Sequence, residues 1–359
     1  MAGRTVIPFG PQHPVLPEPF QLKLTLEEER VVEAVPAFGY IHRGLEQLVE
    51  TRDFIQMVYI VERVCGICTF MHALAYCQGI ETLMGIEVPP RARYLRTIWS
   101  ELQRLHSHHL WLGLLADALG YESLFMQSWK NREAIMDITE ATAGSRVIIS
   151  TCQIGGVRRD IDAKLQGELR RTLDEVEAEL KQIEPVFRDD PTIRARTVGK
   201  AVLTREQAIE LGASGPMLRA SGVPRDLRVT GYAAYGDLDF APITEEAGDN
   251  YARIVVRLRD IHQSLALIRE ALDKLPDGEI AVPFKGNPDG EVVSRVEQPR
   301  GEVVYYIKAN GTRNLERLRI RTPTFANMAP VVHLLPGLEL ADVPVLVLSM
   351  DPCLSCTER

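Results

Sequence analysis

The chain has 359 residues, a length that predicts one large domain or two closely packed ones. Apolar residues make up 45% of the chain and charged residues 25%, as in ordinary globular proteins with a large core. The formal net charge of −8 argues against a general nucleic-acid binder, and no apolar run is long enough to cross a bilayer.

The first segment, residues 1–38, is predicted to contain strands. Residues 20–26 alternate between apolar and polar side chains, and residues 31–37 form a second such run after a charged turn. We expect these two runs to pair.

The middle segment, residues 39–275, is predicted to be a helical body. Pro185 and then residues 189–191 (Asp-Asp-Pro) are expected to end one of its helices, and Thr204 with Gln207 predicts a capping box at the start of another. Residues 212–240 are rich in glycine and irregular, which favours a binding loop over a linker. From apolar periodicity and capping residues, helices are expected at residues 39–51, 69–84, 91–119, 123–143, 160–184, 204–211 and 243–274.

The last segment, residues 276–359, is predicted to mix strand and helix. Residues 301–309 alternate like a strand, and residues 345–348 form a short apolar run. No internal repeat interrupts the chain. The expected class is therefore mainly α with small β elements, an α+β protein folded as a single large domain over residues 1–359.

Four of the six cysteines stand in two pairs with the spacing of metal ligands. Cys65 and Cys68 form the first C-x-x-C pair, and Cys353 and Cys356 form the second. This spacing lets two thiolates from one turn face a single metal ion. A closed zinc site and a redox site with nickel, copper or iron both suit four sulfur ligands. If both pairs serve one site, the first and last parts of the fold must meet there.

The remaining cysteines and a group of histidines are interpreted as structural. Cys77 and Cys152 have no partner at ligand spacing, so we predict that they are buried in the core. On a helix, His106 and His109 share a face while His108 points elsewhere, and no carboxylate completes a metal site. These three histidines are predicted to be solvated or at the edge of the core.

The sequence around both cysteine pairs resembles the two nickel-binding signatures of nickel–iron hydrogenase large subunits. The first signature is Arg-x-Cys-Gly-x-Cys-x-x-x-His at residues 63–72, and the second is Asp-Pro-Cys-x-x-Cys at residues 351–356. Residues 10–14 (Gly-Pro-Gln-His-Pro) and 215–222 (Gly-Pro-Met-Leu-Arg-Ala-Ser-Gly) are similar to the branch shared by energy-converting, membrane-bound hydrogenases, the CO-induced type included, and the 49-kDa subunit of respiratory complex I. The complex I subunit lacks the four cysteines that this chain keeps, so the resemblance favours a nickel–iron site over zinc. It also implies a central helix bundle.

The resemblance implies a role for each cysteine. Cys65 and Cys353 would be terminal thiolates on nickel. Cys68 and Cys356 would bridge nickel to an iron that carries one carbonyl and two cyanide ligands. His72 lies one helical turn after Cys68 and is expected to donate a hydrogen bond to the sulfur of Cys68.

Three further residues receive roles from the same resemblance. Arg300, in a Pro-Arg-Gly stretch, is expected beside the diatomic ligands, where it could bind a cyanide and assist the polarisation of hydrogen. Glu18, between two prolines, is expected to relay the proton. Glu46 aligns with a carboxylate that holds a second, light metal in many hydrogenases, so Glu46 is a candidate magnesium ligand. Their other side-chain ligand is a histidine where this chain has Arg359, so a Glu46–Arg359 ion pair is the alternative.

The expected function is that of the catalytic large subunit of an energy-converting nickel–iron hydrogenase, coupled to ferredoxin and to ion translocation across a membrane. Once four of the six cysteines bind nickel, the chain has no set of cysteines left for an iron–sulfur cluster. The expected partners are therefore a small subunit with a 4Fe–4S cluster, ferredoxin and integral membrane ion-translocating subunits. The start of the chain lacks the apolar stretch of a secretory signal, which predicts a cytoplasmic protein. Together with the membrane subunits that the resemblance implies, the expected position is peripheral, on the cytoplasmic side of the membrane.

Two other functions are alternatives to this one. The first is a metal-free quinone-pocket subunit of a complex I-like dehydrogenase, but such a pocket has no use for four converging thiolates. The second is a zinc-stabilised scaffold protein. Metal analysis would distinguish the three functions. Nickel together with iron would indicate the hydrogenase, no metal the quinone-pocket subunit, and zinc alone the scaffold protein.

Overall fold

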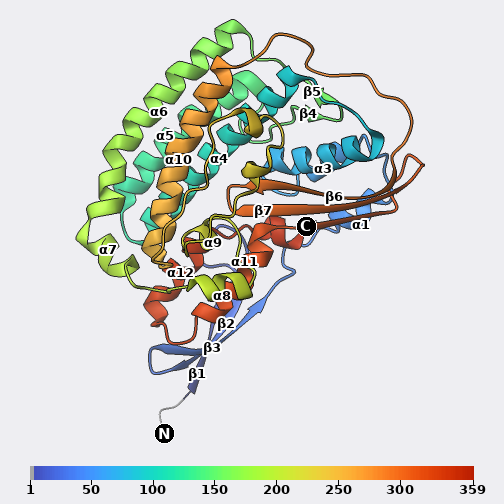
Figure 1. Ribbon diagram of the computed structural model, residues 1–359. Helices are drawn as coiled ribbons and strands as arrows, with labels where there is room; N and C mark the ends of the chain where they lie inside the picture. The colour runs from blue at the N-terminus through green and yellow to red at the C-terminus, as the bar shows by residue number, and fades with distance from the viewer. Residues whose placement is uncertain (1–3) are drawn as a thin grey trace.

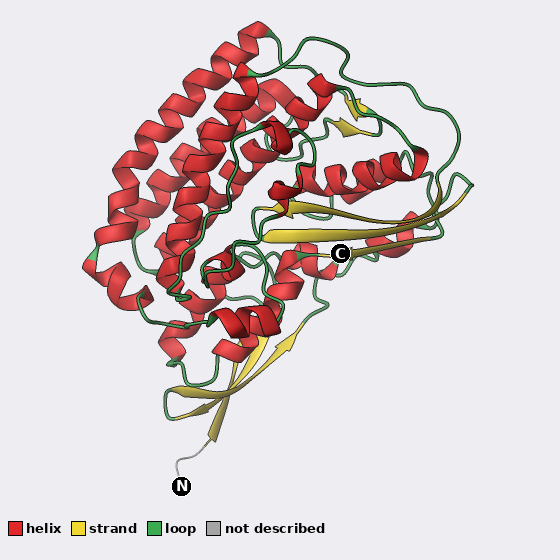
Figure 2. Cartoon of the chain, viewed as in Figure 1, coloured by secondary structure: helices red, strands yellow, loops and turns green. Residues whose placement is uncertain are grey.

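The computed structural model describes residues 4–359, which contain a bundle of long helices, two three-stranded sheets and one two-stranded sheet (Figure 1). The helices are α1 (Leu45–Val49), α2 (Met57–Val61), α3 (Thr69–Met84), α4 (Pro90–Ala118), α5 (Glu122–Ala143), α6 (Ala163–Asp189), α7 (Pro191–Thr197), α8 (Arg205–Glu210), α9 (Pro216–Arg219), α10 (Asn250–Asp273), α11 (Pro323–Leu334), α12 (Val343–Met350) and α13 (Leu354–Glu358), with 3-10 turns η1 (Leu227–Thr230), η2 (Tyr235–Asp237) and η3 (Leu340–Asp342). The strands are β1 (Arg4–Phe9), β2 (Gln21–Glu27), β3 (Arg30–Ala37), β4 (Cys152–Gln153), β5 (Gly156–Val157), β6 (Asp289–Gln298), β7 (Gly301–Asn310) and β8 (Arg317–Arg321). The predicted class, mainly helical with small sheets, is confirmed (Figure 2).

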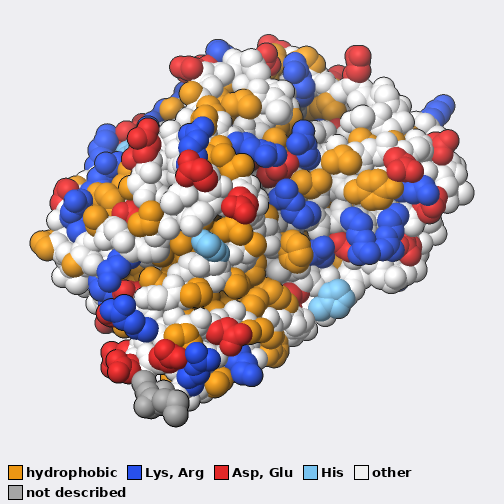
Figure 3. Space-filling model, turned by 60° about the horizontal axis from the view of Figure 1, so that its bottom comes forward, with side chains coloured by type: hydrophobic (Ala, Val, Ile, Leu, Met, Phe, Trp, Pro, Cys, Tyr) orange, Lys and Arg blue, Asp and Glu red, His pale blue; other side chains and the backbone are white. Residues whose placement is uncertain are grey.

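Helix α4 forms the centre of the bundle, because it packs against α5, α10 and α12 and is buried along nearly its whole length. Helix α6 lies outside and buries a single stripe at three- and four-residue spacing, which runs from Leu169 through Leu173, Val176 and Leu180 to Phe187. Among the helices of residues 4–359, none is both long and apolar enough to span a bilayer. Over the face drawn in Figure 3, acidic and basic side chains are interspersed.

The two three-stranded sheets are antiparallel and lie at the two ends of the sequence. In the C-terminal sheet, Glu297 pairs with Glu302 and Gln298 pairs with Gly301. The tight register leaves only Pro299 and Arg300 in the turn between β6 and β7. The hairpin therefore presents Arg300 at a fixed point, while α3 packs across β6 and β7.

A second hydrophobic core joins the beginning of the chain to its last helices. Apolar side chains of the N-terminal sheet pack there against α9, α11 and α12 (Figure 1). Its fully buried members include Leu22, Leu24, Met217, Val331 and Leu346. Because this core holds the two ends of the sequence together, it helps to bring the two cysteine pairs close to each other.

Several predicted boundaries are wrong for identifiable reasons. Only Leu45–Val49 is helical within residues 39–51, because Gly39 and Gly44 take left-handed φ values of 113° and 65°. The helix predicted from residue 243 begins at Asn250, since the side chain of Asp249 caps it through a 2.7 Å hydrogen bond from the amide of Ala252.

Pro185 does not end a helix but lies inside α6, which ends at Asp189 with Asp190 as its C-cap, at the second of the two predicted stops. A proline in a helix interior costs about 3 kcal/mol. The buried side chains of Ile183 and Phe187 flank it, and their burial on the bundle offsets that loss. The apolar run at residues 345–348 lies within helix α12.

Candidate metal centre

The four predicted ligand sulfurs lie together in one buried cluster. Cys65 Sγ is 3.2 Å from Cys353 Sγ, and Cys68 Sγ is 3.4 Å from Cys356 Sγ. The sulfurs of Cys65, Cys68 and Cys356 lie within 4.8 Å of one another. None of the four residues is more than 2% exposed. The two pairs meet as the spacing argument requires, and four soft donors at this separation fit a thiophilic metal.

Two segments at the starts of α3 and α13 bring the sulfurs into place. Cys65 and Cys68 lie between α2 and α3, where Cys68 caps α3 with a non-helical φ of −120° and ψ of 37°. Cys353 immediately precedes α13 and Cys356 lies within it. The amide of Cys353 donates to Thr324 Oγ1 at 3.1 Å, which fixes the entry into the second loop.

The protein alone does not hold all four sulfurs as anions. Burial by itself would raise the pKa of Cys68, but hydrogen bonds from the neighbouring thiols lower it well below its usual range. Burial raises the pKa of the Cys356 thiol well above its usual range, and the neighbouring sulfurs raise it further. A bound cation removes this penalty, because it replaces the protons that the thiols would otherwise keep. The cluster is therefore suited to a metal centre.

Arg300 lies buried beside this cluster in a pair with Asp351. Its Nε donates to the carbonyl of Asp351 and its Nη2 to the carboxylate Oδ1, both at 2.9 Å. Although burial alone would lower the pKa of Arg300, Asp351 and the cysteine sulfurs raise it well above its ordinary value. Within residues 4–359, Arg300 Nη1 and Asp351 Oδ2 are buried without a hydrogen-bond partner. Such unused donors and acceptors fit a group that joins them when the centre is loaded.

His72 contacts the cluster, but at a different sulfur from the one predicted. Its Nε2 lies 3.3 Å from Cys356 Sγ, and the hydroxyl of Tyr305 lies 2.7 Å from its Nδ1. The prediction of Cys68 was wrong because it extended helical geometry back to Cys68, which has left the helix at its cap. With the tyrosine hydroxyl as donor to Nδ1, Nε2–H donates to the sulfur.

Glu18 holds the turn between the last two cysteines. Its carboxylate accepts hydrogen bonds from the amides of Leu354 and Ser355, the latter at 2.8 Å, and from the Ser355 hydroxyl. Glu18 is half-buried and also lines a surface hollow of about 300 Å³ formed by residues 11–19. It therefore lies between the second cysteine pair and solvent.

Glu46 is paired by protein donors. Arg359 Nε lies 2.9 Å from its Oε1, which also accepts from the amide of Ile320 at 2.8 Å, while Arg319 lies 2.6 Å from Oε2. Burial by itself would raise the pKa of Glu46, but these hydrogen bonds outweigh it and lower the pKa. The Glu46–Arg359 ion pair is thus confirmed, and a light metal at Glu46 stays a prediction.

Sequence reasoning missed Arg43, which ties the two cysteine loops together. Its Nη1 donates to the carbonyl of Arg63 at 2.9 Å, and its Nη2 donates to Val64 at 2.6 Å and Ser355 at 3.1 Å. No spacing or signature in the sequence marks this arginine, because its bonds go to backbone carbonyls of distant segments. The role of Asp351 was also missed, although the Asp-Pro-Cys signature contains it.

The three histidines of α4 do not form a metal site. His106 Nε2 lies 2.9 Å from Arg132 and His109 Nε2 lies 3.1 Å from Asn131, both on α5, whereas His108 faces α10. The predicted division of faces is right, but the expected solvation is wrong: all three are buried because α4 is covered on every side. Burial lowers the pKa of His106 and His108 to about 3 and that of His109 to about 4, so these side chains are neutral.

Cys77 and Cys152 are fully buried in the main core, as predicted.

Two protein families and several known proteins are similar to this chain. The family described as "Respiratory-chain NADH dehydrogenase, 49 Kd subunit" matches residues 118–286 and 283–359, and the family described as "Nickel-dependent hydrogenase" matches residues 43–128. The chain is 42% identical to the membrane-bound hydrogenase subunit alpha of Pyrococcus furiosus, over 98% of this chain and 87% of that protein. It is 40% identical to the carbon monoxide-induced hydrogenase of Rhodospirillum rubrum, over 98% and 99%.

A solved structure is similar over almost the whole chain. It belongs to the membrane-bound sulfane sulfur reductase, an archaeal respiratory membrane complex, and matches with a TM-score of 0.95 and 31% identity. The match covers 99% of this chain and 98% of that one.

Proposed function

We propose a function from one premise: this chain belongs to the family that unites the large subunits of nickel-dependent hydrogenases with the 49-kDa subunit of respiratory NADH dehydrogenase. We infer that it is the catalytic large subunit of an energy-converting nickel–iron hydrogenase, which interconverts hydrogen with protons and electrons. The observation that carries this proposal is the buried cluster of four cysteine sulfurs drawn from both ends of the sequence.

The cluster argues against the two other functions. A metal-free quinone pocket would leave four buried thiols crowded together with no chemical role. A structural zinc site is closed by its four ligands and needs no further donor. Here a buried guanidinium with a free Nη1 stands beside the sulfurs, which suits a centre that carries additional ligands.

In the proposed centre, Cys65 and Cys353 would hold nickel, and Cys68 and Cys356 would bridge nickel to an iron with carbonyl and cyanide ligands. When bound, this centre supplies the Lewis acidity that polarises hydrogen. Arg300 would contribute positive charge and the free Nη1 donor, oriented by its two bonds to Asp351. Because these groups are fixed before the reaction, they need no reorganisation during it.

Two side chains would manage protons and electron density around the sulfurs. His72, held by Tyr305, would donate to Cys356 and stabilise the charge on that sulfur. Glu18 would accept the proton that leaves the cysteine turn and pass it toward the hollow formed by residues 11–19.

Electrons would have to leave through another polypeptide. With four cysteines at the centre, only the buried Cys77 and Cys152 remain, which are too few for a four-cysteine cluster. We propose a small subunit with a 4Fe–4S cluster, ferredoxin as the redox partner, and membrane subunits that translocate ions. The peripheral position at the cytoplasmic side of the membrane is part of this proposal. It is supported by relatives described as membrane-bound and by the similar chain in an archaeal respiratory membrane complex.

Metal analysis with infrared spectroscopy tests the proposal on the complex purified without oxygen. We expect nickel and iron in equal amounts, and absorption bands from metal-bound carbonyl and cyanide. Zinc alone, or no metal in a folded complex, would contradict it.

A pair of cysteine variants assigns the result to the cluster. Cys356→Ser should remove the infrared bands and hydrogen turnover, because the sulfur pair Cys68–Cys356 is lost. Cys152→Ala is the matched control, since this cysteine is equally buried outside the cluster and its variant should keep both signals.

A further inference from the structure

The end of α12 has a backbone conformation that few residue types adopt. Asp351 follows this helix as its C-cap, with a φ of 63° and a ψ of 68°. Helices that end in this left-handed conformation usually place glycine there, because a Cβ atom crowds the backbone. Glycine would not serve here, since the carboxylate of Asp351 accepts a 2.9 Å hydrogen bond from Arg300 Nη2. The same residue begins the short segment that leads to Cys353, so its conformation helps to place that sulfur.

Three buried side chains donate hydrogen bonds to the carbonyl groups of this helix end, and they come from α4, α10 and the β6–β7 turn. They are Trp111 (to Leu348, 2.6 Å), Arg257 (to Met350, 3.2 Å) and Arg300 (to Asp351, 2.9 Å). Helices α4 and α10 both pack against α12 (Figure 1). The last four carbonyls of a helix lack a helical partner, so they need such donors when they are buried. A residue in a sparsely populated conformation persists only where its surroundings fix it in this way.

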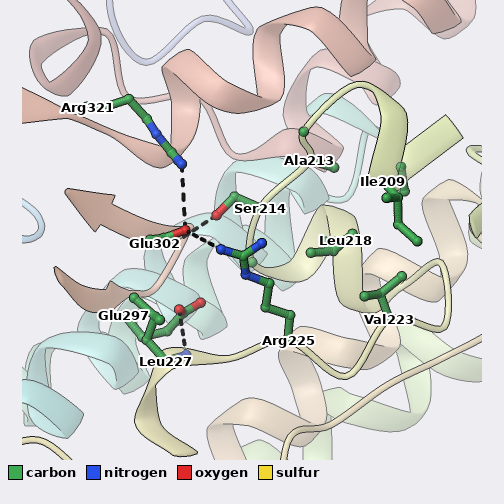
Figure 4. Close-up of a pocket in the computed structure, with 13 residues that line it drawn as sticks. Ile209, Ala213, Ser214, Leu218, Val223, Arg225, Leu227, Glu297, Glu302 and Arg321 are labelled. Atoms are coloured by element: carbon green, nitrogen blue, oxygen red, sulfur yellow. Dashed lines mark hydrogen bonds and ion pairs between the residues drawn. The ribbon is translucent and has the colours of Figure 1, made fainter. Parts of the chain in front are cut away.

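Arg300 reaches the helix end from a turn that other contacts already fix. The amide of Glu302, near the start of β7, donates to Ser214 Oγ at 2.8 Å, and the carboxylate of Glu302 faces Arg225 at 3.3 Å (Figure 4). A Cβ atom added to Gly215 would lie 2.4 Å from the carbonyl oxygen of Arg300, so the backbone is closely packed on this side as well. The turn is therefore held independently of α12.

Among residues 4–359, Arg257 has no ion pair that would account for its burial. Its side chain is fully buried, with the guanidinium carbon 4.3 Å from the ring centre of Trp111. The two carboxylates that act on its charge, Asp260 and Asp351, are each paired with another arginine. Burial lowers the pKa of Arg257 to about 10, so the group is still a cation at pH 7. A buried cation without a carboxylate partner is costly, and the negative end of the α12 dipole offsets part of that cost.

We propose that Arg257 is a positioning residue for the second cysteine pair. By holding the carbonyl of Met350, it keeps Asp351 in the left-handed conformation from which the chain enters Cys353. Asp351 in turn orients Arg300. The effect is transmitted through the backbone, since the hydrogen bonds of Arg257 all go to backbone carbonyls. This inference rests on the proposed function, in which the second pair holds the nickel–iron centre.

Infrared spectroscopy of the complex purified without oxygen tests the inference. Arg257→Met keeps an unbranched side chain against Trp111 but removes the donors. We expect the carbonyl and cyanide bands to shift or broaden relative to the parent, because Arg300 and Cys353 are less well fixed. Arg257→Lys keeps a charge and a donor at this position and should return the bands toward those of the parent.

Hydrogen–deuterium exchange of the same complexes gives a readout that needs no metal signal. Amides of residues 351–357 should exchange about tenfold faster in Arg257→Met, because the loss of a buried hydrogen bond favours local opening. If the parent shows no carbonyl or cyanide bands, the proposed function fails, and exchange alone decides whether Arg257 positions this segment. Arg257→Gln is too short to place a donor at the Nη2 position, so it replaces Arg257→Met in both measurements if that variant does not assemble.

Arg253→Met is the matched control. Arg253 is equally buried one helical turn earlier on α10, but it donates to the carbonyls of Ala201 and Gly248 and to side chains, not to the last carbonyls of α12. Its variant should keep the parent bands and the parent exchange of residues 351–357. Unchanged exchange or unchanged bands in Arg257→Met would overturn the inference. Equal changes in the two variants would do the same, because they would reflect a general loosening of the bundle.

Discussion

Two buried polar regions of this molecule differ in whether their charges balance. A network in the helical bundle holds three carboxylates against three guanidinium groups, each paired with an opposite charge within 4 Å. Its six side chains are fully buried: Glu101, Asp226, Asp260, Arg104, Arg219 and Arg228.

The cysteine cluster has no such balance. Ionised, its four sulfurs would face one nearby guanidinium, Arg300, whose charge is already matched by Asp351. The network is therefore complete within the chain, whereas the cluster requires positive charge from outside it. Buried polar side chains therefore do not mark a functional site by themselves, whereas a buried group whose charge the fold leaves unbalanced does.

The largest effect should come from removing the proposed proton carrier at the unbalanced region. Glu18→Gln keeps acceptors for the amides of Leu354 and Ser355 but cannot carry a proton. We expect hydrogen turnover to fall by about 10²–10⁴-fold, with nickel content and urea unfolding unchanged. Glu33→Gln, an exposed carboxylate of the same N-terminal segment, is the control. Turnover within twofold of the parent would contradict a relay through Glu18.

The balanced network should respond in the opposite way. Asp260→Asn leaves Arg219 without its 2.6 Å partner in a fully buried position. We expect the free energy of unfolding in urea to fall by about 3–5 kcal/mol, while turnover per nickel atom is retained. Asp174→Asn removes an exposed partner of Arg269 and should change stability by less than about 0.5 kcal/mol. Equal losses in the two variants would erase the distinction between the regions.

The same network predicts the response to acid. Burial alone would raise the pKa of Asp260, but Arg219 and the hydrogen bonds around it hold that pKa well below its ordinary value. Its contribution to stability is therefore complete above the unfolded pKa of about 3.9 and is lost as pH falls below it. Urea midpoints measured between pH 6 and pH 3 should fall less steeply for Asp260→Asn than for the parent.

The smallest change in stability is expected at the Glu46–Arg359 ion pair, which lies beside the cysteine cluster and whose charges are balanced. Arg359→Gln removes one of three donors to Glu46, which keeps Arg319 and the amide of Ile320. The loss in unfolding free energy should be about 1 kcal/mol or less. Magnesium found by metal analysis in the parent and lost in Glu46→Gln would instead mean that Glu46 holds a metal.

Where local patterns decide the structure, sequence reasoning succeeded. Residues 69–84 and 204–211 were predicted to be helical within one residue of α3 and α8, and the capping box of Thr204 and Gln207 is present. Apolar periodicity and caps are properties of neighbouring residues, so no distant contact is needed to interpret them.

Where distant contacts decide, sequence reasoning failed or was silent. Pro185 stays inside a helix because tertiary packing on both sides of it outweighs its local penalty. His72 bonds to Cys356 instead of Cys68, and Arg43 joins two loops through backbone carbonyls. The cysteine pairs were found because their spacing is local, and their meeting was inferred only from the chemistry of a shared site.

The two cysteine pairs lie far apart in the sequence, so the ribosome synthesises them at different times. Cys65 and Cys353 touch in space but are 288 residues apart. At about 5–20 residues per second, a ribosome takes roughly 15–60 s to cover that distance. During this delay the first two thiols have no counterparts, so they are open to oxidation or to capture by the wrong ion. Loading of the proposed centre would then depend on keeping these thiols reduced and on delivery of the metals after translation has passed the second pair.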